Sequence, residues 1–370
     1  MGNTPPRIFS GITAIRGRFG NKISLGDKKM RRQFLASLVI LVILVFAGCP
    51  NPDVVEVPSI GDTQTVTAGS EILSMIYVND SASLIFPTGI NDDGTAALTA
   101  KFWMAETEIT NAVMAEVLQW AYDNGRFSAT VGDHNGLDTH TVKHGGQQLL
   151  NLDGDSIPCR IDYNGSGNFS TESGYENHPV THVTWYGAVM FCNWLTEMRD
   201  GNTGSVVYTD IDTDWEADET TENITRTGFR LPSSDEWEYT ARYRGADAVN
   251  TVSGYSNPYY TKGDSASGAT ADYTDVAACQ AVAIYSGQVP APTEAAAVKS
   301  LGTGSANALG LYDMSGNVWE WCFTESGLNR IYRGGSWYNA VSSQRVGVWY
   351  NLNMSTASNG LGLRLCRTAD

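Results

Sequence analysis

The sequence predicts an α+β fold with little regular secondary structure and many loops. The 370-residue chain contains 38 glycines and 12 prolines, a share that favours turns over a helical bundle. Three segments show the apolar spacing of helices, and most of the remaining chain alternates short β-type runs with clusters of Gly, Asn, Asp and Ser. An apolar fraction of 42% is sufficient for a hydrophobic core.

Charge is distributed unevenly along the chain. There are 24 Lys and Arg against 40 Asp and Glu, which gives a net charge of -16. The first 48 residues hold eight of the basic residues and one Asp, so the remainder carries a net charge of -23. Binding to nucleic acid needs clustered Lys and Arg. We therefore expect no nucleic-acid partner.

The N-terminal segment resembles a bacterial lipoprotein signal. A basic stretch precedes an uncharged apolar run of 15 residues, 34–48, which is short for a membrane-spanning helix of about 20 residues and typical of a signal-peptide core. The run ends in the letters FAGC, which resemble a lipobox and imply lipidation of Cys49. An uncleaved short membrane anchor is the alternative, and Met30 is an alternative start.

We expect three parts in the chain. Residues 1–48 are the basic segment and signal peptide, and residues 49–77 are the lipidated cysteine and a tether rich in Pro, Gly, Thr and Ser. Residues 78–370 form one globular domain, because no second linker of comparable length follows.

Three helices are expected, at about 110–120, 184–195 and 233–242. In the third, Ser233 is the predicted N-cap and Glu236 completes a capping box. The stretch 202–227 is acidic and rich in turn residues, which predicts a surface loop. Its Asp-rich part imitates the start of an EF-hand, but Trp215 stands where that turn requires Gly, so we interpret it as a solvated loop. The disulfide pairing of Cys159, Cys192, Cys279, Cys322 and Cys366 is not readable from their spacing.

Several separated strings resemble one family in order. They are FWMAETEITN (102–111), HPVTHVTWY (178–186), FRLP (229–232), EWE (236–238), GLYDMSGNVWEW (310–321), RGGSW (333–337) and GLR (362–364). Together they resemble the formylglycine-generating-enzyme, or sulfatase-modifying factor, family. That resemblance covers about 78–370 and implies a C-type-lectin fold elaborated with loops.

The tryptophans and charges inside these strings are expected to hold the scaffold. Large rings fill a core in which regular structure is sparse. The tryptophans expected to pack in this way are Trp185, Trp237, Trp319, Trp321 and Trp337. The charges expected to be buried or half-buried in pairs are Glu106, Glu108, Arg230, Glu236, Glu238 and Arg364.

The resemblance does not extend to the family's oxidase chemistry. That activity uses two copper-binding cysteines after the Gly-Gly-Ser-aromatic motif, and the matching positions here are Asn339 and Gln344. Neither side chain supplies the thiolate that Cu(I) requires. We therefore expect a protein that is not an enzyme and requires no cofactor, with a divergent oxidase or modifying enzyme as the alternative. His178 and His182 are four residues apart, but Pro179 argues against a helix that presents both to a metal.

The resemblance also implies a structural calcium site. Carried over position by position, its ligands are Asp313, Glu320 and the backbone carbonyls of Gly316 and Val318. Two carboxylates among hard oxygen ligands suit calcium.

The segment 337–362 has the composition of a recognition loop. It concentrates Tyr, Trp, Asn, Ser and Met without clear periodicity over its middle part. Its frame resembles the variable region of diversity-generating-retroelement proteins, and the lipoprotein layout resembles the treponemal variable type. The predicted ligand-binding residues are Tyr338, Asn339, Ser343, Gln344, Val348, Trp349, Tyr350, Leu352 and Asn353. The alternative is an ordinary loop whose aromatic residues are half-buried.

The expected function is therefore a diversified binding site displayed on a lectin-like scaffold. Its partner would be a macromolecule, either a protein or a glycan, and its lipid would hold it in the cell envelope, with the outer membrane and the cell surface as the expected location. A structural envelope lipoprotein is a further alternative.

Overall fold

The computed structural model describes residues 57–79, 84–127, 141–153, 156–211, 215 and 220–369. The predicted signal peptide and Cys49 lie outside the described residues. Among the residues described, no helix is both long enough and apolar enough to cross a membrane.

Three of the helices, α2, α3 and α4, begin where the sequence predicts, whereas α5 was not predicted. Within the described residues the α-helices are α2 (Asn111–Asp123), α3 (Trp185–Asp200), α4 (Ser234–Arg242) and α5 (Val276–Gln280), and the 3-10 helices are η2 (Thr303–Ser305) and η3 (Val341–Ser343). Thr110 and Thr184 cap α2 and α3 through their hydroxyl oxygens. At α4, Ser233 and Glu236 form the predicted capping box. These side chains satisfy backbone N–H groups that a helix leaves unpaired at its start.

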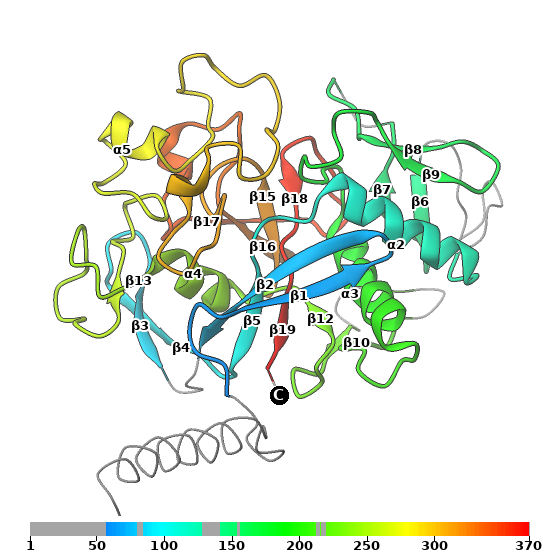
Figure 1. Cartoon of the computed structure of the whole chain (residues 1–370), viewed down its shortest axis with the longest axis horizontal. Coiled ribbons are helices and arrows are strands. Elements are labelled where there is room, and N and C mark those ends of the chain that lie inside the picture. The colour runs from blue at the N-terminus through cyan, green and yellow to red at the C-terminus, as the bar shows by residue number, and fades with distance from the viewer. Residues whose placement is uncertain are drawn as a thin grey trace, which may run out of the picture. The chain divides into compact units, whose positions relative to one another are not determined.

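A five-stranded antiparallel sheet joins the two ends of the described chain. Its order is β1 (Thr63–Ala68), β2 (Glu71–Asn79), β5 (Phe102–Ala105), β19 (Cys366–Thr368) and β12 (Phe229–Arg230). Figure 1 shows the blue N-terminal strands close to the red C-terminal strand. Strand β1 and most of β2 fall within the predicted tether, 49–77, so that part of the prediction is wrong. Val66, Leu73 and Met75 of these strands pack in the core, and a tether has no such contacts.

A second sheet of four strands carries the C-terminal motifs. Its order is β17 (Trp349–Leu352), β16 (Asn329–Arg333), β15 (Trp319–Ser326) and β18 (Leu361–Gly362). The pair β15–β18 is parallel and the other pairs are antiparallel. Strand β17 is therefore an edge of this sheet (Figure 1).

Five two-stranded hairpins complete the fold of the described residues. They pair β3 (Ile85–Thr88) with β4 (Gly94–Ala97), β6 (Thr141–His144) with β7 (Gln147–Asn151), β8 (Ile161–Tyr163) with β9 (Phe169–Thr171), β10 (Tyr208–Thr209) with β11 (Thr221–Glu222), and β13 (Tyr243–Gly245) with β14 (Tyr259–Tyr260). The β10–β11 hairpin corrects the prediction of a plain surface loop at 202–227. Trp215 is fully buried there, and its ring packs 4.8 Å from that of Tyr186.

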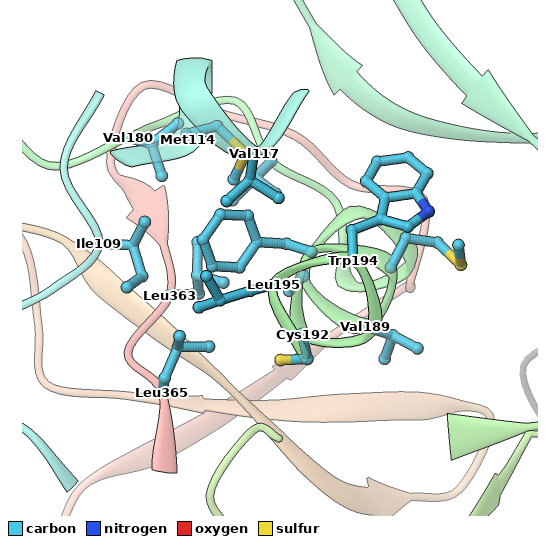
Figure 2. Packing of buried hydrophobic residues seen from close by; sticks show 14 of the residues in the cluster. Ile109, Met114, Val117, Val180, Val189, Cys192, Trp194, Leu195, Leu363 and Leu365 are labelled. Atoms are coloured by element: carbon cyan, nitrogen blue, oxygen red, sulfur yellow. The ribbon is translucent and has the colours of Figure 1, made fainter. Parts of the chain in front are cut away.

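The middle of the five-stranded sheet is buried on both faces. Met75 and Tyr77 of β2 enter one core cluster with α2 and α3, whereas Ile76 and Val78 enter a second cluster with α4. This alternation follows from the two-residue period of a strand. Figure 2 shows the first cluster, where side chains of α2 and α3 meet those near the C-terminus. The residues labelled there are Ile109, Met114, Val117, Val180, Val189, Cys192, Trp194, Leu195, Leu363 and Leu365.

The motif tryptophans pack in the core and also brace it through their indole N–H groups. Trp185, Trp237, Trp319 and Trp321 are buried, and Trp337 is half-buried. Trp185 donates to the carbonyl of Cys322, and Trp321 donates to that of Val183, each at 3.1 Å. The prediction that these rings hold the scaffold is confirmed.

The predicted buried charges are paired. Arg230 bonds both oxygens of Glu236 at 2.7 Å, and Glu238 accepts from Arg242 and Arg333. The remaining pairs are Glu106 with Lys299 at 2.7 Å, Glu320 with Arg364 at 2.8 Å, and Glu108 with Arg364 at 4.0 Å. Burial of a charge is costly unless it is paired and hydrogen-bonded.

All five cysteines in the described part of the chain are free and buried. Burial raises the pKa of each thiol, to about 12 for Cys159 and about 11 for Cys279, and well above its usual value for Cys192 and Cys366. Burial likewise raises the pKa of the Cys322 thiol. These sulfurs are held as unreactive thiols within the core.

Replacing Arg364 by Met should destabilise the protein by about 3–5 kcal/mol, because Glu320 then keeps a buried charge without its cation. The matched control is Arg126→Met, since Arg126 is 42% exposed and pairs with Glu197 at the surface. That variant should lose about 1 kcal/mol or less. Urea unfolding of both variants makes the comparison, and equal losses would contradict the assigned role of Arg364.

Stability should also depend on the charge of Glu222 in β11. Burial raises its pKa from 4.5 to about 7, partly offset by Arg230. Between those pH values the folded chain holds a proton that the unfolded chain releases, so this residue lowers stability as pH rises through the window. Glu222→Gln should therefore stabilise the protein by about 1–3 kcal/mol at pH 8 and have little effect at pH 4. Glu325→Gln, at a side chain 64% exposed, is the control in chemical unfolding at both pH values.

Candidate functional site

An aromatic cleft opens on one face of the four-stranded sheet. Its volume is about 220 Å³. The residues that line it are Trp319, Tyr332, Tyr338, Asn339, Ser343, Tyr350, Leu352, Ser358 and Leu361. All nine side chains are uncharged at neutral pH. The cleft therefore offers aromatic surface and neutral hydrogen-bonding groups.

Strand alternation places the aromatic rings of the cleft. Trp319, Tyr332 and Tyr350 belong to β15, β16 and β17, and Tyr332 lies directly opposite Tyr350 in the ladder. The Trp319 ring meets both tyrosines edge-on, with centroids 4.8 Å and 5.5 Å away. Trp319 is 4% exposed, whereas Tyr338 and Tyr350 are 42% and 48% exposed. The tryptophan is thus the floor of the cleft, and the two tyrosines are its rim.

Three phenol groups lie close together in the cleft. Burial raises the pKa of Tyr332 to about 12, and the neighbouring hydroxyls of Tyr338 and Tyr350 add to that rise. Tyr332 therefore stays neutral at physiological pH. A neutral phenol can both donate and accept a hydrogen bond.

The loop that carries the rim is braced by two side chains. The Oδ1 atom of Asn339 accepts from Trp319 Nε1 at 2.8 Å and from Ser336 Oγ at 2.5 Å. Gln344 is fully buried, and its amide donates to the carbonyls of Ser336 and Ala340. Asn339 and Gln344 are the positions that match the family's copper cysteines, and here they hold the loop in shape.

A glycine keeps Gln344 in place. Gly335 has a φ of 84°, in the left-handed region that favours glycine. A Cβ atom there would lie 2.0 Å from Gln344 Oε1. The Gly-Gly-Ser-Trp motif therefore shapes the wall of the cleft through backbone conformation.

The structure brings five of the nine predicted ligand-binding residues into the cleft. They are Tyr338, Asn339, Ser343, Tyr350 and Leu352. Asn353 is exposed but is not part of the cleft lining.

Two predicted residues need correction, and Trp349 lies outside the cleft lining. Gln344 and Val348 are 0% and 4% exposed, so the prediction that they contact a ligand is wrong. Gln344 braces the loop, and Val348 packs in the core cluster with α2 and α3. Trp349 is 46% exposed, but it precedes Tyr350 on the same strand and so points to the opposite face of the sheet.

Four cleft residues were missed by the sequence prediction: Trp319, Tyr332, Ser358 and Leu361. Trp319 was expected only to pack in the core, but its ring both packs there and lines the cleft. The sequence held a signal for Tyr332, because it lies in a β-type run just before the Arg-Gly-Gly-Ser-Trp motif. It is two residues after Arg330, so the period of a strand places both side chains on the same face. Leu361 enters the cleft through the parallel pairing of β18 with β15, which places it opposite Trp319, and Ser358 lies in the loop just before β18.

The two carboxylates predicted to bind calcium, Asp313 and Glu320, are already engaged with protein groups. Both oxygens of Glu320 accept from Arg364, at 2.8–3.1 Å, and one accepts from Trp237 Nε1 at 2.5 Å. Asp313 is 3% exposed and accepts from the backbone N–H of Lys299. In the described part of the chain, no group of three or more His, Cys, Asp or Glu side chains is placed to hold a metal ion. The guanidinium of Arg364 supplies the positive charge that calcium would bring to Glu320, so this carboxylate does not fit the predicted role. Of the EF-hand-like run, 212–214 lies outside the described residues.

Comparison with known proteins gives the family. Residues 78–369 match the sulfatase-modifying factor enzyme 1-like domain. The chain belongs to this family. The predicted fold class, α+β with a C-type-lectin fold of the formylglycine-generating-enzyme type, is confirmed.

Two curated relatives show how far the similarity extends. The chaperone protein LppX of Paenibacillus barcinonensis is 30% identical over 211 residues, which cover 52% of this chain and 71% of that protein. The formylglycine-generating enzyme of Streptomyces coelicolor is 26% identical over 226 residues, which cover 54% of this chain and 55% of the enzyme. The alignment with the enzyme thus spans about half of its length.

A solved structure shares the fold. Treponema denticola variable protein 1 superposes on this family member with a TM-score of 0.53 at 22% identity, and the match covers 83% of this chain and 99% of that one. At this identity the comparison shows the fold, and function has to be argued from the cleft.

Within this family scaffold, the rim of the cleft should depend on Gly360. A Cβ atom at that position would lie 2.2 Å from Tyr338 Cε1, so Gly360→Ala should push the tyrosine ring outward at a cost of about 1 kcal/mol. Gly304→Ala is the control, because nothing lies within 4 Å of its added carbon. Crystal structures and unfolding curves of both variants make the test, and an unmoved Tyr338 ring in Gly360→Ala would contradict the packing described.

Proposed function

We propose that this chain is a non-catalytic binding protein that displays a variable aromatic cleft on a scaffold of the sulfatase-modifying factor family. The observation that carries the proposal is the convergence of Tyr338, Asn339, Ser343, Tyr350 and Leu352 on one open cleft. These residues come from the segment whose composition predicts recognition. Similarity to a treponemal variable protein supports the proposal at the level of the fold.

The chemistry of the cleft suits binding. Tyrosine and tryptophan supply large, rigid contact surface at low entropic cost, and small polar residues supply adaptable hydrogen bonds. The exposed rim, Tyr338 and Tyr350, stands above a buried floor of Trp319. Anchors of this kind dominate the energy of many protein interfaces.

The same cleft lacks the parts of an oxidase among its lining residues. Asn339 and Gln344 stand where the family's copper cysteines are expected, and both brace the loop. Cys322 and Cys366 are fully buried, and burial raises the pKa of both thiols, so neither is available as a thiolate. These facts support a non-catalytic role and disfavour a divergent oxidase.

A lipid on Cys49 would hold the domain at the cell envelope, with the outer membrane and the cell surface as the proposed location. The sequence pattern at 34–49 supports this part of the proposal, because it resembles a lipoprotein signal. Segments before β1 would then act as the tether.

The decisive test is genetic. The DNA around the gene should contain a near-copy of the codons for about Arg330 to Arg364, differing mainly at adenines, beside a gene for a reverse transcriptase. Sequencing the locus in several isolates makes the measurement, with the codons for 178–186 as the internal control that should not vary. An invariant segment without such a repeat would contradict the proposal and favour a structural envelope protein.

A further inference from the structure

We propose that the edge of β17 docks an extended, uncharged segment of a partner polypeptide, which adds to the sheet as a fifth strand and places one side chain in the aromatic cleft. The inference rests on the proposed function, since it names the class of ligand for the same site. The proposed occupant is a polypeptide, and a neutral glycan is the alternative occupant.

The outer edge of β17 carries unpaired backbone groups. The strand is outermost in the order β17-β16-β15-β18. Within the described residues, the backbone groups of Trp349–Leu352 make no backbone hydrogen bond beyond the ladder with β16. In an antiparallel ladder every second residue turns its N–H and C=O away from its neighbour. Two of the four residues therefore present unpaired donors and acceptors at this edge, which another strand can satisfy.

Strand β17 also carries two exposed aromatic residues. Trp349 and Tyr350 are 46% and 48% exposed and point to opposite faces of the same edge strand. A ligand confined to the cleft meets Tyr350 and leaves Trp349 unused. An added strand meets both, because its own side chains alternate between the two faces.

Charge complementarity selects a neutral segment. All nine residues that line the cleft and all four residues of β17 are uncharged at neutral pH, although the chain as a whole carries a net charge of -16. A charged side chain entering here would lose hydration without gaining an ion pair. The partner segment should therefore be apolar or neutral where it meets β17.

The size of the cleft fits one side chain. Its volume of about 220 Å³ is below the roughly 300–1,000 Å³ typical of pockets that enclose a small-molecule ligand. Main-chain hydrogen bonds would then supply affinity and the cleft would supply specificity, as in other cases of strand addition. A neutral glycan could stack on the rings, but it would make no use of the unpaired strand edge or of Trp349.

The experiment selects binders from a phage-displayed library of random 12-residue peptides on the purified full chain. We expect enriched peptides that are neutral over at least four residues. Trp349→Ala and Tyr350→Ala should each weaken the binding of a selected synthetic peptide at least tenfold. Ile72→Ala, at a side chain 67% exposed on β2 of the five-stranded sheet, is the control and should leave binding unchanged. Circular dichroism and melting curves verify that each variant is folded.

N-methylation of the selected peptide tests the strand pairing itself. Methyl groups on alternate amides should abolish binding in one frame and be tolerated in the other, because only one set of N–H groups faces β17. If both frames bind equally, or if Trp349→Ala has no effect, strand addition is wrong.

The remaining outcomes separate this inference from the function on which it rests. Binding on an array of neutral glycans that requires Tyr350, with no peptide selected, would overturn the polypeptide occupant and leave the binding function standing. Peptides that bind independently of both aromatic residues would overturn the inference in the same way. Failure of peptides and glycans alike, together with an invariant gene segment, would overturn both.

Discussion

The carboxylate of Glu320 is the point on which the rest of the structure depends. It accepts from Arg364 and from Trp237, and so joins the last motif of the chain to α4 and β15. Arg364 also donates to the carbonyls of Ala105 and Tyr312, which ties in β5 and the segment before β15. A buried charge is stable only when each partner is in place, so this cluster fixes the relative positions of the elements around it. Trp319 directly precedes Glu320 on β15 and points to the other face of the sheet, where it forms the floor of the cleft.

Most of the side chains that hold the scaffold are separate from the exposed side chains of the cleft, although Trp319 and Asn339 belong to both. Trp185, Trp321 and Trp337 donate their indole N–H groups to backbone carbonyls and pin loops that have little secondary structure. Gln344 and Gly335 hold the loop at the rim. The exposed rim residues, in contrast, are only weakly constrained by packing, since Tyr338 and Tyr350 are 42% and 48% exposed to solvent. A site built in this way can change its side chains while its frame stays constant.

The sequence predicted the helices well because their caps are local signals. Thr184 and Ser233 act within three residues of their own position. The early strands were missed because residues 49–77 are rich in Pro, Gly, Thr and Ser, which favours a tether. Strands β1 and β2 pair with each other across a two-residue turn at Gly69 and Ser70, whereas the pairing of β2 with β5 has no local signature. In the recognition segment, composition identified the right stretch but not the side each residue faces. That depends on β17 pairing with β16, which buries Val348 and separates Trp349 from Tyr350.

The central claim is that the identity of the solvent-accessible cleft residues is independent of the stability of the scaffold. The most direct measurement is the free energy of unfolding for variants at every position from 337 to 362. The account predicts changes within about 1 kcal/mol for substitutions at Tyr338, Ser343 and Tyr350, and losses of about 2–5 kcal/mol for large-to-small changes at buried Val346 and Val348. Equal losses in the two groups would contradict it, because the cleft would then be part of the core.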